Sequence, residues 1–169
     1  MSASLILLER TSRWAAAFRR EMRKAAPSRQ RRGRESLASN SVLLAKTFDA
    51  KDSRPLALQE VRSIPHCQRE LEAAPYSVVA VEVLPQNLVA AAKALGDWSH
   101  RFPQARFLVL AARGLEPYEL LLREAGALHV VFSPRSLDPL LRLIRRHLAR
   151  APQPELTLEE SVWAGLPWG

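Results

Sequence analysis

The side chains that could carry catalysis or hold a metal are few in this chain and far apart in its sequence. Four histidines fall on four different predicted elements: His66, His100, His129 and His147. A catalytic or metal-binding cluster is therefore not expected from them. The single cysteine, Cys67, has no partner for a disulfide and no second thiol at the spacing of a zinc site. No glycine-rich phosphate loop follows Leu8 and no Gly-x-Ser-x-Gly motif occurs, so we expect no enzyme, no metal and no cofactor.

Positive charge is a stronger chemical signal. The chain has 25 Lys and Arg against 17 Asp and Glu, a formal net charge of +8. Much of the excess positive charge lies in residues 19–34, where Glu21 is the single acidic residue. The basic residues there are Arg19, Arg20, Arg23, Lys24, Arg29, Arg31, Arg32 and Arg34. Clustered cations bind phosphates through counterion release, which leaves weak nucleic-acid binding open as an alternative function. No aromatic residue interleaves after Phe18 and no base-reading motif is visible, which favours a solvated helix face.

Length and composition indicate one globular domain with extra segments. The chain has 169 residues, of which 47% are hydrophobic, enough for a sizeable core. The apolar run at residues 5–8 is too short for a signal-peptide core, and no run reaches transmembrane length. We therefore expect a cytoplasmic protein without membrane association.

Short apolar runs alternate with helical patterns over residues 1–150. Buried strands are predicted at residues 4–8, 56–64, 77–83, 106–111 and 128–132. Amphipathic helices are predicted at about 12–27, 66–74, 87–100, 117–126 and 136–150. This alternation predicts an α/β fold, a flavodoxin-like three-layer sandwich whose five-stranded parallel sheet has the order 2-1-3-4-5.

Two segments lie outside this alternation. Residues 27–55 form a basic, polar insertion, in which only residues 41–48 are apolar enough to dock as a strand or short helix. Residues 151–169 form a tail rich in proline and tryptophan. Trp163, Leu166 and Trp168 are large apolar side chains that could anchor a partner, or fold back onto the domain itself.

The C-terminal half carries a family resemblance. Residues 126–148, GALHVVFSPRSLDPLLRLIRRHL, resemble the Gly-Ala, fifth strand, Lys-Pro, Ser-Leu and fifth helix of response-regulator receiver domains. The order and spacing of the elements are similar from residue 75 to 150, and the match is looser before that. The resemblance implies a receiver-like fold.

The same resemblance implies that the phosphotransfer residues are lost. Glu9 and Arg10 stand where receivers have two magnesium-binding acids, and a guanidinium cannot ligate a cation. Glu82 replaces the phosphoacceptor aspartate, and its longer side chain moves the carboxylate away from in-line geometry. Ala111 stands where receivers have a hydroxyl residue at the end of the fourth strand. Ser133 replaces the lysine that follows the fifth strand, and Pro134 matches the proline after that lysine. The resemblance thus implies a degenerate pocket, in which the Ser133–Pro134 bond is expected to be cis. The Arg10 side chain either enters this pocket and pairs with Glu82 or points to solvent, and we favour the pairing.

Receivers commonly bind partners through the fourth helix, fifth strand and fifth helix. Residues on or near these elements form the expected partner face: Tyr118, Leu122, Arg135, Leu141 and Arg145. We therefore predict a phosphorylation-independent signalling or protein-interaction module of the two-component type. Its expected partner is another protein, a second copy of this chain included.

Overall fold

Five parallel strands form one sheet at the centre of the protein. The computed structural model describes residues 3–24 and 56–152. The strands are β1 (Leu5–Leu8), β2 (Leu58–Val61), β3 (Val78–Val83), β4 (Arg106–Ala111) and β5 (Ala127–Val131). Their order is β2-β1-β3-β4-β5, and each neighbouring pair is parallel. The predicted order is confirmed, with β3 in the central position.

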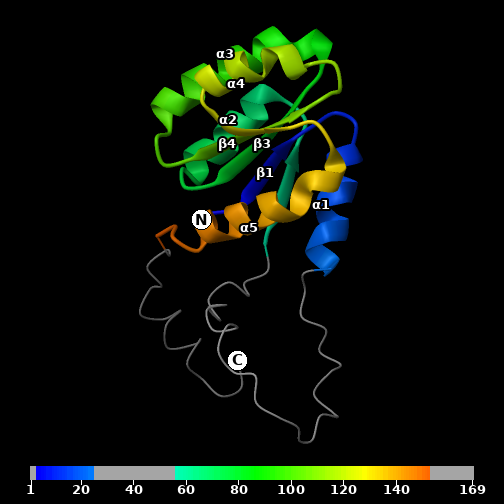
Figure 1. Cartoon of the computed structure of the whole chain (residues 1–169). Coiled ribbons are helices and arrows are strands. Elements are labelled where there is room, and N and C mark those ends of the chain that lie inside the picture. Colours follow the sequence, from blue (N-terminus) through cyan, green and yellow to red (C-terminus); the bar gives the residue numbers. More distant parts are fainter. Residues whose placement is uncertain (1–2, 25–55, 153–169) are drawn as a thin grey trace, which may run out of the picture.

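Helices cover both faces of this sheet (Figure 1). One face carries α1 (Arg13–Lys24) and α5 (Leu137–Leu148). The opposite face carries α2 (Ile64–Ala73), α3 (Leu88–Arg101) and α4 (Glu119–Glu124). Short 3-10 turns lead into three of them: η2 (Pro85–Asn87), η3 (Glu116–Tyr118) and η4 (Pro134–Ser136). The architecture is the predicted three-layer sandwich.

The apolar strand runs reflect burial on both faces. Alternate residues of β1 enter different cores: Leu5 and Leu7 face α1 and α5, whereas Ile6 and Leu8 face the other helices. All six residues of β3 are buried. Because successive side chains of a strand point to opposite faces, two covered faces require an unbroken apolar run.

A glycine ends the connection between β4 and β5, just after α4. Gly126 has φ of +107°, a region that side chains with a Cβ rarely adopt. A Cβ there would lie 2.6 Å from the Cβ of Ser99 on α3. Gly126 therefore permits both the turn into β5 and the close approach of α3.

Some boundaries differ from the prediction. The fourth helix is only six residues long, since residues 116–118 form a 3-10 turn. β5 begins at Ala127, and its pairing with β4 shifts register between Phe107 and Leu108, which leaves Leu128 as an extra residue. Within residues 3–24 and 56–152, none of the helices combines the length and apolar character needed to cross a membrane.

Candidate functional site

The residues predicted for the degenerate pocket come together at one edge of the sheet. Glu9 follows β1, Glu82 is the fifth residue of β3, Ala111 ends β4, and Ser133 follows β5. Since the strands are parallel, their carboxyl ends share this edge, which is where ligands bind in open α/β sheets. The sheet topology alone therefore assembles the site.

The carboxylate of Glu82 is held by the loop that follows β1. Glu82 is only 4% exposed. Its Oε2 accepts the main-chain N–H of Arg10 at 2.8 Å and that of Thr11 at 3.4 Å, and its Oε1 accepts the Thr11 hydroxyl at 2.5 Å. Three donors from two adjacent residues thus hold this carboxylate, which stands where the receiver resemblance predicts the phosphoacceptor.

The predicted pairing of the Arg10 guanidinium with Glu82 is wrong. Among the ion pairs of the described residues, none joins these two side chains. The contact is made by the Arg10 main chain, and the Arg10 side chain is exposed. The physical reason is that a main-chain N–H satisfies the buried carboxylate without removing a guanidinium from water.

Glu9 caps the first helix from a buried position. It is 1% exposed, and its two carboxylate oxygens accept the main-chain N–H groups of Trp14 (3.0 Å) and Ala15 (3.2 Å) in the first turn of α1. These N–H groups have no partner within the helix, and the helix dipole favours a negative charge there. Burial raises the pKa of Glu9 above its ordinary value; the two hydrogen bonds oppose this and nearby Glu82 adds to it.

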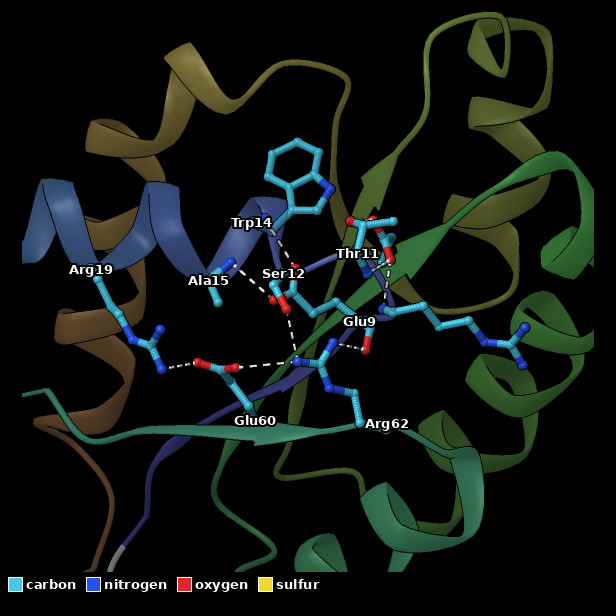
Figure 2. A network of polar contacts seen from close by, with 10 residues as sticks. Glu9, Thr11, Ser12, Trp14, Ala15, Arg19, Glu60 and Arg62 are labelled. Carbon is cyan, nitrogen blue, oxygen red and sulfur yellow. Dashed lines mark hydrogen bonds and ion pairs between the residues drawn. The ribbon is translucent and has the colours of Figure 1, made fainter.

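An outer set of polar side chains surrounds the same loop (Figure 2). Arg62 donates to the Glu9 carbonyl at 3.3 Å and to the Ser12 hydroxyl at 2.8 Å, and lies 3.8 Å from Glu60. Glu60 also pairs with Arg19 of α1. The loop between β1 and α1 is therefore tied both to β3 and to the end of β2.

Sequence reasoning missed Thr11, Ser12, Glu60 and Arg62 as parts of the site. From sequence, a hydroxyl pair next to a strand end, Thr11 and Ser12, indicates only a helix cap. Ser12 instead has φ of +58°, which bends the chain so that Glu9 reaches the helix N-terminus. Glu60 and Arg62 lie at or just after the end of β2. They could be assigned to the site only once β2 was known to be the neighbour of β1 in the sheet.

The other predicted pocket positions offer few free hydrogen-bonding groups. Ala111 is 1% exposed and brings no hydrogen-bond donor in its side chain. Ser133 is engaged locally, where its Oγ accepts the N–H of Arg135 at 3.3 Å. The predicted cis bond at Ser133–Pro134 is wrong, since this peptide bond is trans. Pro134 instead begins η4, where its fixed φ suits the first turn.

The site does not fit the magnesium ion that receivers use. Both of its acids, Glu9 and Glu82, already accept main-chain N–H groups, and Arg10 occupies the place of the third expected carboxylate. Within the described residues, no three His, Cys, Asp or Glu side chains gather in a way that could bind a metal ion. Hard cations need several oxygen ligands that are free to turn toward them.

The predicted partner face is partly corrected. Tyr118 and Arg135 are exposed and Arg145 is half-buried. Leu122 and Leu141 are 0% and 2% exposed, so they belong to the core and cannot contact a partner. The helix pattern identified their elements correctly but did not distinguish the core side of each helix from its outer side.

The predicted phosphate-contacting set lies only partly within the described residues. Arg19 pairs with Glu60, while Arg20 and Lys24 both pair with Glu21. Arg23 is exposed on α1. Four arginines of this set and the three tail anchors lie outside the described residues: Arg29, Arg31, Arg32, Arg34, Trp163, Leu166 and Trp168.

Comparisons with known proteins support the fold. No protein-family model matches the chain, and no curated protein matches it in sequence. Among solved structures, it is similar to a CheY-like protein (tadZ) of Pseudomonas aeruginosa PAO1, with a TM-score of 0.53 and 16% identity over 91% of this chain and 99% of that one. It is also similar to a protein assigned as a response regulator from Chloroflexus aurantiacus J-10-fl, with a TM-score of 0.53 and 14% identity over 89% and 100% of the two chains. The chain therefore has the fold of CheY-like response-regulator receivers.

Proposed function

We propose that this chain is a signalling or protein-interaction module that works without phosphorylation. The fold is that of receivers, while the positions that would carry phosphotransfer have other residues or other partners. Fold alone does not establish function, so the proposal depends on the site.

One observation carries the proposal. The Glu82 carboxylate, at the phosphoacceptor position, accepts three hydrogen bonds from Arg10 and Thr11. An attacking carboxylate oxygen must be free and aligned with the bond that breaks, and three donors on it oppose both requirements. The same contacts tie the loop between β1 and α1 to Glu82. The Glu82 carboxylate is therefore a constant feature of the site, whereas a receiver changes state when its acceptor carboxylate gains a phosphoryl group.

Treatment with magnesium and acetyl phosphate tests this proposal. We expect intact-mass analysis to show no stoichiometric phosphoryl adduct on this chain, whereas a receiver with an intact acidic pocket, treated in parallel, gains one. The matched variant is Glu82→Gln, which keeps the side-chain length. An adduct that forms on the natural chain and disappears in Glu82→Gln would show a working phosphoswitch and overturn the proposal.

An apolar surface suggests where a partner binds. Among the described residues, six large hydrophobic side chains are exposed, and five of them lie between η3 and α5: Tyr118, Leu120, Leu121, Leu128 and Leu143. We call these five the apolar partner face. Leu128 lies on β5, the strand at the edge of the sheet, and the other four lie on η3, α4 and α5, which precede and follow β5 in the chain. Large apolar side chains exposed to solvent are typical of protein–protein contacts when they form one surface.

Self-association of the chain is expected to use this face. Replacing Leu121 and Leu128 together by glutamate should weaken any dimer at least about tenfold, because buried apolar anchors carry most of the binding energy. Val89→Glu is the matched control, since Val89 is 81% exposed but lies on α3. Sedimentation velocity over a range of concentrations measures the effect. A dimer that survives the double substitution unchanged contradicts this assignment of the face.

A further inference from the structure

The helices on the two faces of the sheet differ in charge. Together α1 and α5 carry eight Lys and Arg against two acids, Glu21 and Asp138. In contrast, α2, α3 and α4 together carry four Lys and Arg against five Asp and Glu. Within the described residues, the face of the sheet that α1 and α5 cover is therefore the strongly basic one (Figure 1).

Three basic residues of α1 lie on its outer side and toward α5. Arg19 pairs with Glu60 of β2, so the side of α1 that bears Arg19 lies toward this edge strand. Successive helical residues are about 100° apart, which places Arg20, Arg13 and Lys24 about 100–140° further round the helix, away from β2. All three are exposed. Because α1 and α5 contact each other on the same face of the sheet, this is the side of α1 nearest α5.

One arginine of α5 faces α1 in turn. On α5, Nε2 of His147 lies 3.2 Å from the Tyr76 carbonyl just before β3, and the ring is close enough to Arg106 at the start of β4 for their charges to interact. Since β4 lies beyond β3 as seen from β2, this side of α5 faces away from α1. Arg145 is about 160° from His147 around the helix, so it faces α1.

Two further arginines of α5 complete a single surface. Arg142 and Arg146 lie between the Arg145 side and the His147 side of the helix, and both are exposed. We call the six residues of this surface the basic face: Arg13, Arg20, Lys24, Arg142, Arg145 and Arg146. They come from opposite ends of the described chain, so only folding brings them together.

The two acids on these helices neutralise only part of the basic face. Glu21 pairs with Arg20 at 3.5 Å and with Lys24 at 2.9 Å. Asp138 pairs with Arg142 at 3.2 Å. Pairs with exposed partners such as these are weak and are screened by salt. Within the described residues, no ion pair involves the other three members, so the face keeps an excess of positive charge.

The surroundings of the basic face favour a duplex nucleic acid over other anionic partners. Helices that bind a lipid surface also insert large apolar side chains into it, and protein partners rely on similar anchors. Among the described residues of α1 and α5, Leu143 is the one large apolar side chain that is exposed, and it lies on the opposite side of α5 from Arg145. Trp14 and Phe18 are buried, so α1 offers no aromatic ring on which single-stranded bases could stack. The face therefore presents cations without anchors, which suits the phosphates of a duplex.

The dimensions of the basic face match a nucleic-acid backbone. From Arg13 to Lys24 is about 16 Å along the helix axis. A DNA strand carries one phosphate per about 3.4 Å of duplex axis, so this length covers about five phosphates of one strand. Packed helices lie about 8–10 Å apart, so the arginines of α5 lie beside the same stretch of backbone.

We propose that the basic face binds the phosphate backbone of duplex nucleic acid without reading its sequence. Its arginine and lysine side chains donate to phosphate oxygens, and the release of counterions from the duplex supplies most of the binding free energy. The binding is therefore strongest at low salt. This inference goes beyond the proposed function and does not depend on whether Glu82 accepts a phosphoryl group.

Fluorescence anisotropy with a short labelled DNA duplex of mixed sequence tests the proposal on the full chain. If the face contacts about four phosphates, a fourfold rise in salt should weaken binding on the order of a hundredfold. A second duplex of unrelated sequence should bind with the same affinity. A single strand of the same length should bind more weakly, because no aromatic side chain stacks its bases. The absence of binding at low salt, or a strong preference for one sequence, overturns the proposal.

Neutral substitutions test whether the basic face itself contacts the duplex. The first variant neutralises three exposed arginines of the face together: Arg20→Gln, Arg142→Gln and Arg146→Gln. The slope of log affinity against log salt should fall by about three. The matched control removes the same charge from exposed positions on the opposite helices: Arg69→Gln, Lys93→Gln and Arg123→Gln. Its slope should stay close to that of the natural chain. Equal losses in the two variants, or a first variant that binds like the natural chain, overturn the proposal.

A charge-preserving variant and a lipid probe complete the test. Replacing the same three arginines of the face by lysine should retain most of the affinity, because lysine also binds phosphate, as a point charge. Loss of binding in this variant, with a circular dichroism spectrum like that of the natural chain, contradicts binding through charge. Vesicles containing phosphatidylserine are the parallel probe. A chain that sediments with these vesicles and does not bind the duplex has a membrane partner, which overturns the proposal.

Discussion

Glu82→Ala is expected to lower the free energy of unfolding by about 3 kcal/mol. The substitution leaves three donors without their acceptor: the N–H of Arg10, the N–H of Thr11 and the Thr11 hydroxyl. Hydrogen bonds to a charged group contribute about 1.5–3 kcal/mol each, and bonds that share one carboxylate are not additive. Urea denaturation measures the loss as a lower midpoint at an unchanged slope.

The size of this effect distinguishes a structural carboxylate from a functional one. A carboxylate kept free for chemistry is commonly a stability cost, so its removal is neutral or stabilising. Thr11→Val serves as the matched control, because it removes only the hydroxyl bond to the carboxylate and should cost about 1.5 kcal/mol. If Glu82→Ala is no more destabilising than a surface change such as Glu124→Ala, the loop is not held by Glu82 in the way that we infer.

Glu9→Ala is expected to cost about 2 kcal/mol, because it removes the cap of α1. The N–H groups of Trp14 and Ala15 lose their acceptors, and the loss of a helix cap costs up to about 2 kcal/mol. Amide hydrogen exchange should show faster exchange in the first turn of α1, with little change in α3. Unchanged protection of Trp14 and Ala15 would contradict the capping role.

The same residue predicts a dependence of stability on pH. The native pKa of Glu9 is raised above 4.5, mainly by burial, so the folded protein keeps this proton at pH values where the unfolded chain has released it. This contribution to stability is fully present below the unfolded pKa and is lost as pH rises through the native pKa. Against Glu9→Gln, the natural chain should therefore lose relative stability as pH rises from about 4 toward 7. Two stability curves that run parallel over this range would be inconsistent with a raised pKa.

The sequence was sufficient to predict the sheet. The strands β1, β3 and β4 each contain an unbroken apolar run such as residues 78–81, and the helical patterns between the strands require parallel crossovers. Element ends were less accurate, because local preferences compete there. Pro117, for example, begins a 3-10 turn that delays α4 to Glu119.

The partners within the site could not be predicted in the same way. The resemblance placed Glu9 and Glu82 at one edge of the sheet, but it did not show that main-chain N–H groups occupy both carboxylates. Such contacts depend on the path of the β1–α1 loop, which the positive φ of Ser12 helps to set and which no residue pattern reveals. Leu122 and Leu141 were misplaced for a different reason, since apolar residues on a helix are equally compatible with its core side and with a partner.

The extra residue in β5 has a consequence for how the protein avoids aggregation. β5 lies at one edge of the sheet, where unpaired main-chain groups could template the addition of a foreign strand. Leu128, the residue left over by the register shift against β4, interrupts the regular pairing at the start of this strand. A bulge of this kind increases the local twist and makes an edge a poor template for cross-β growth. The chain can thus keep leucines exposed beside an open strand, and complexes formed there are expected to be held by side chains and to dissociate without leaving fibrils.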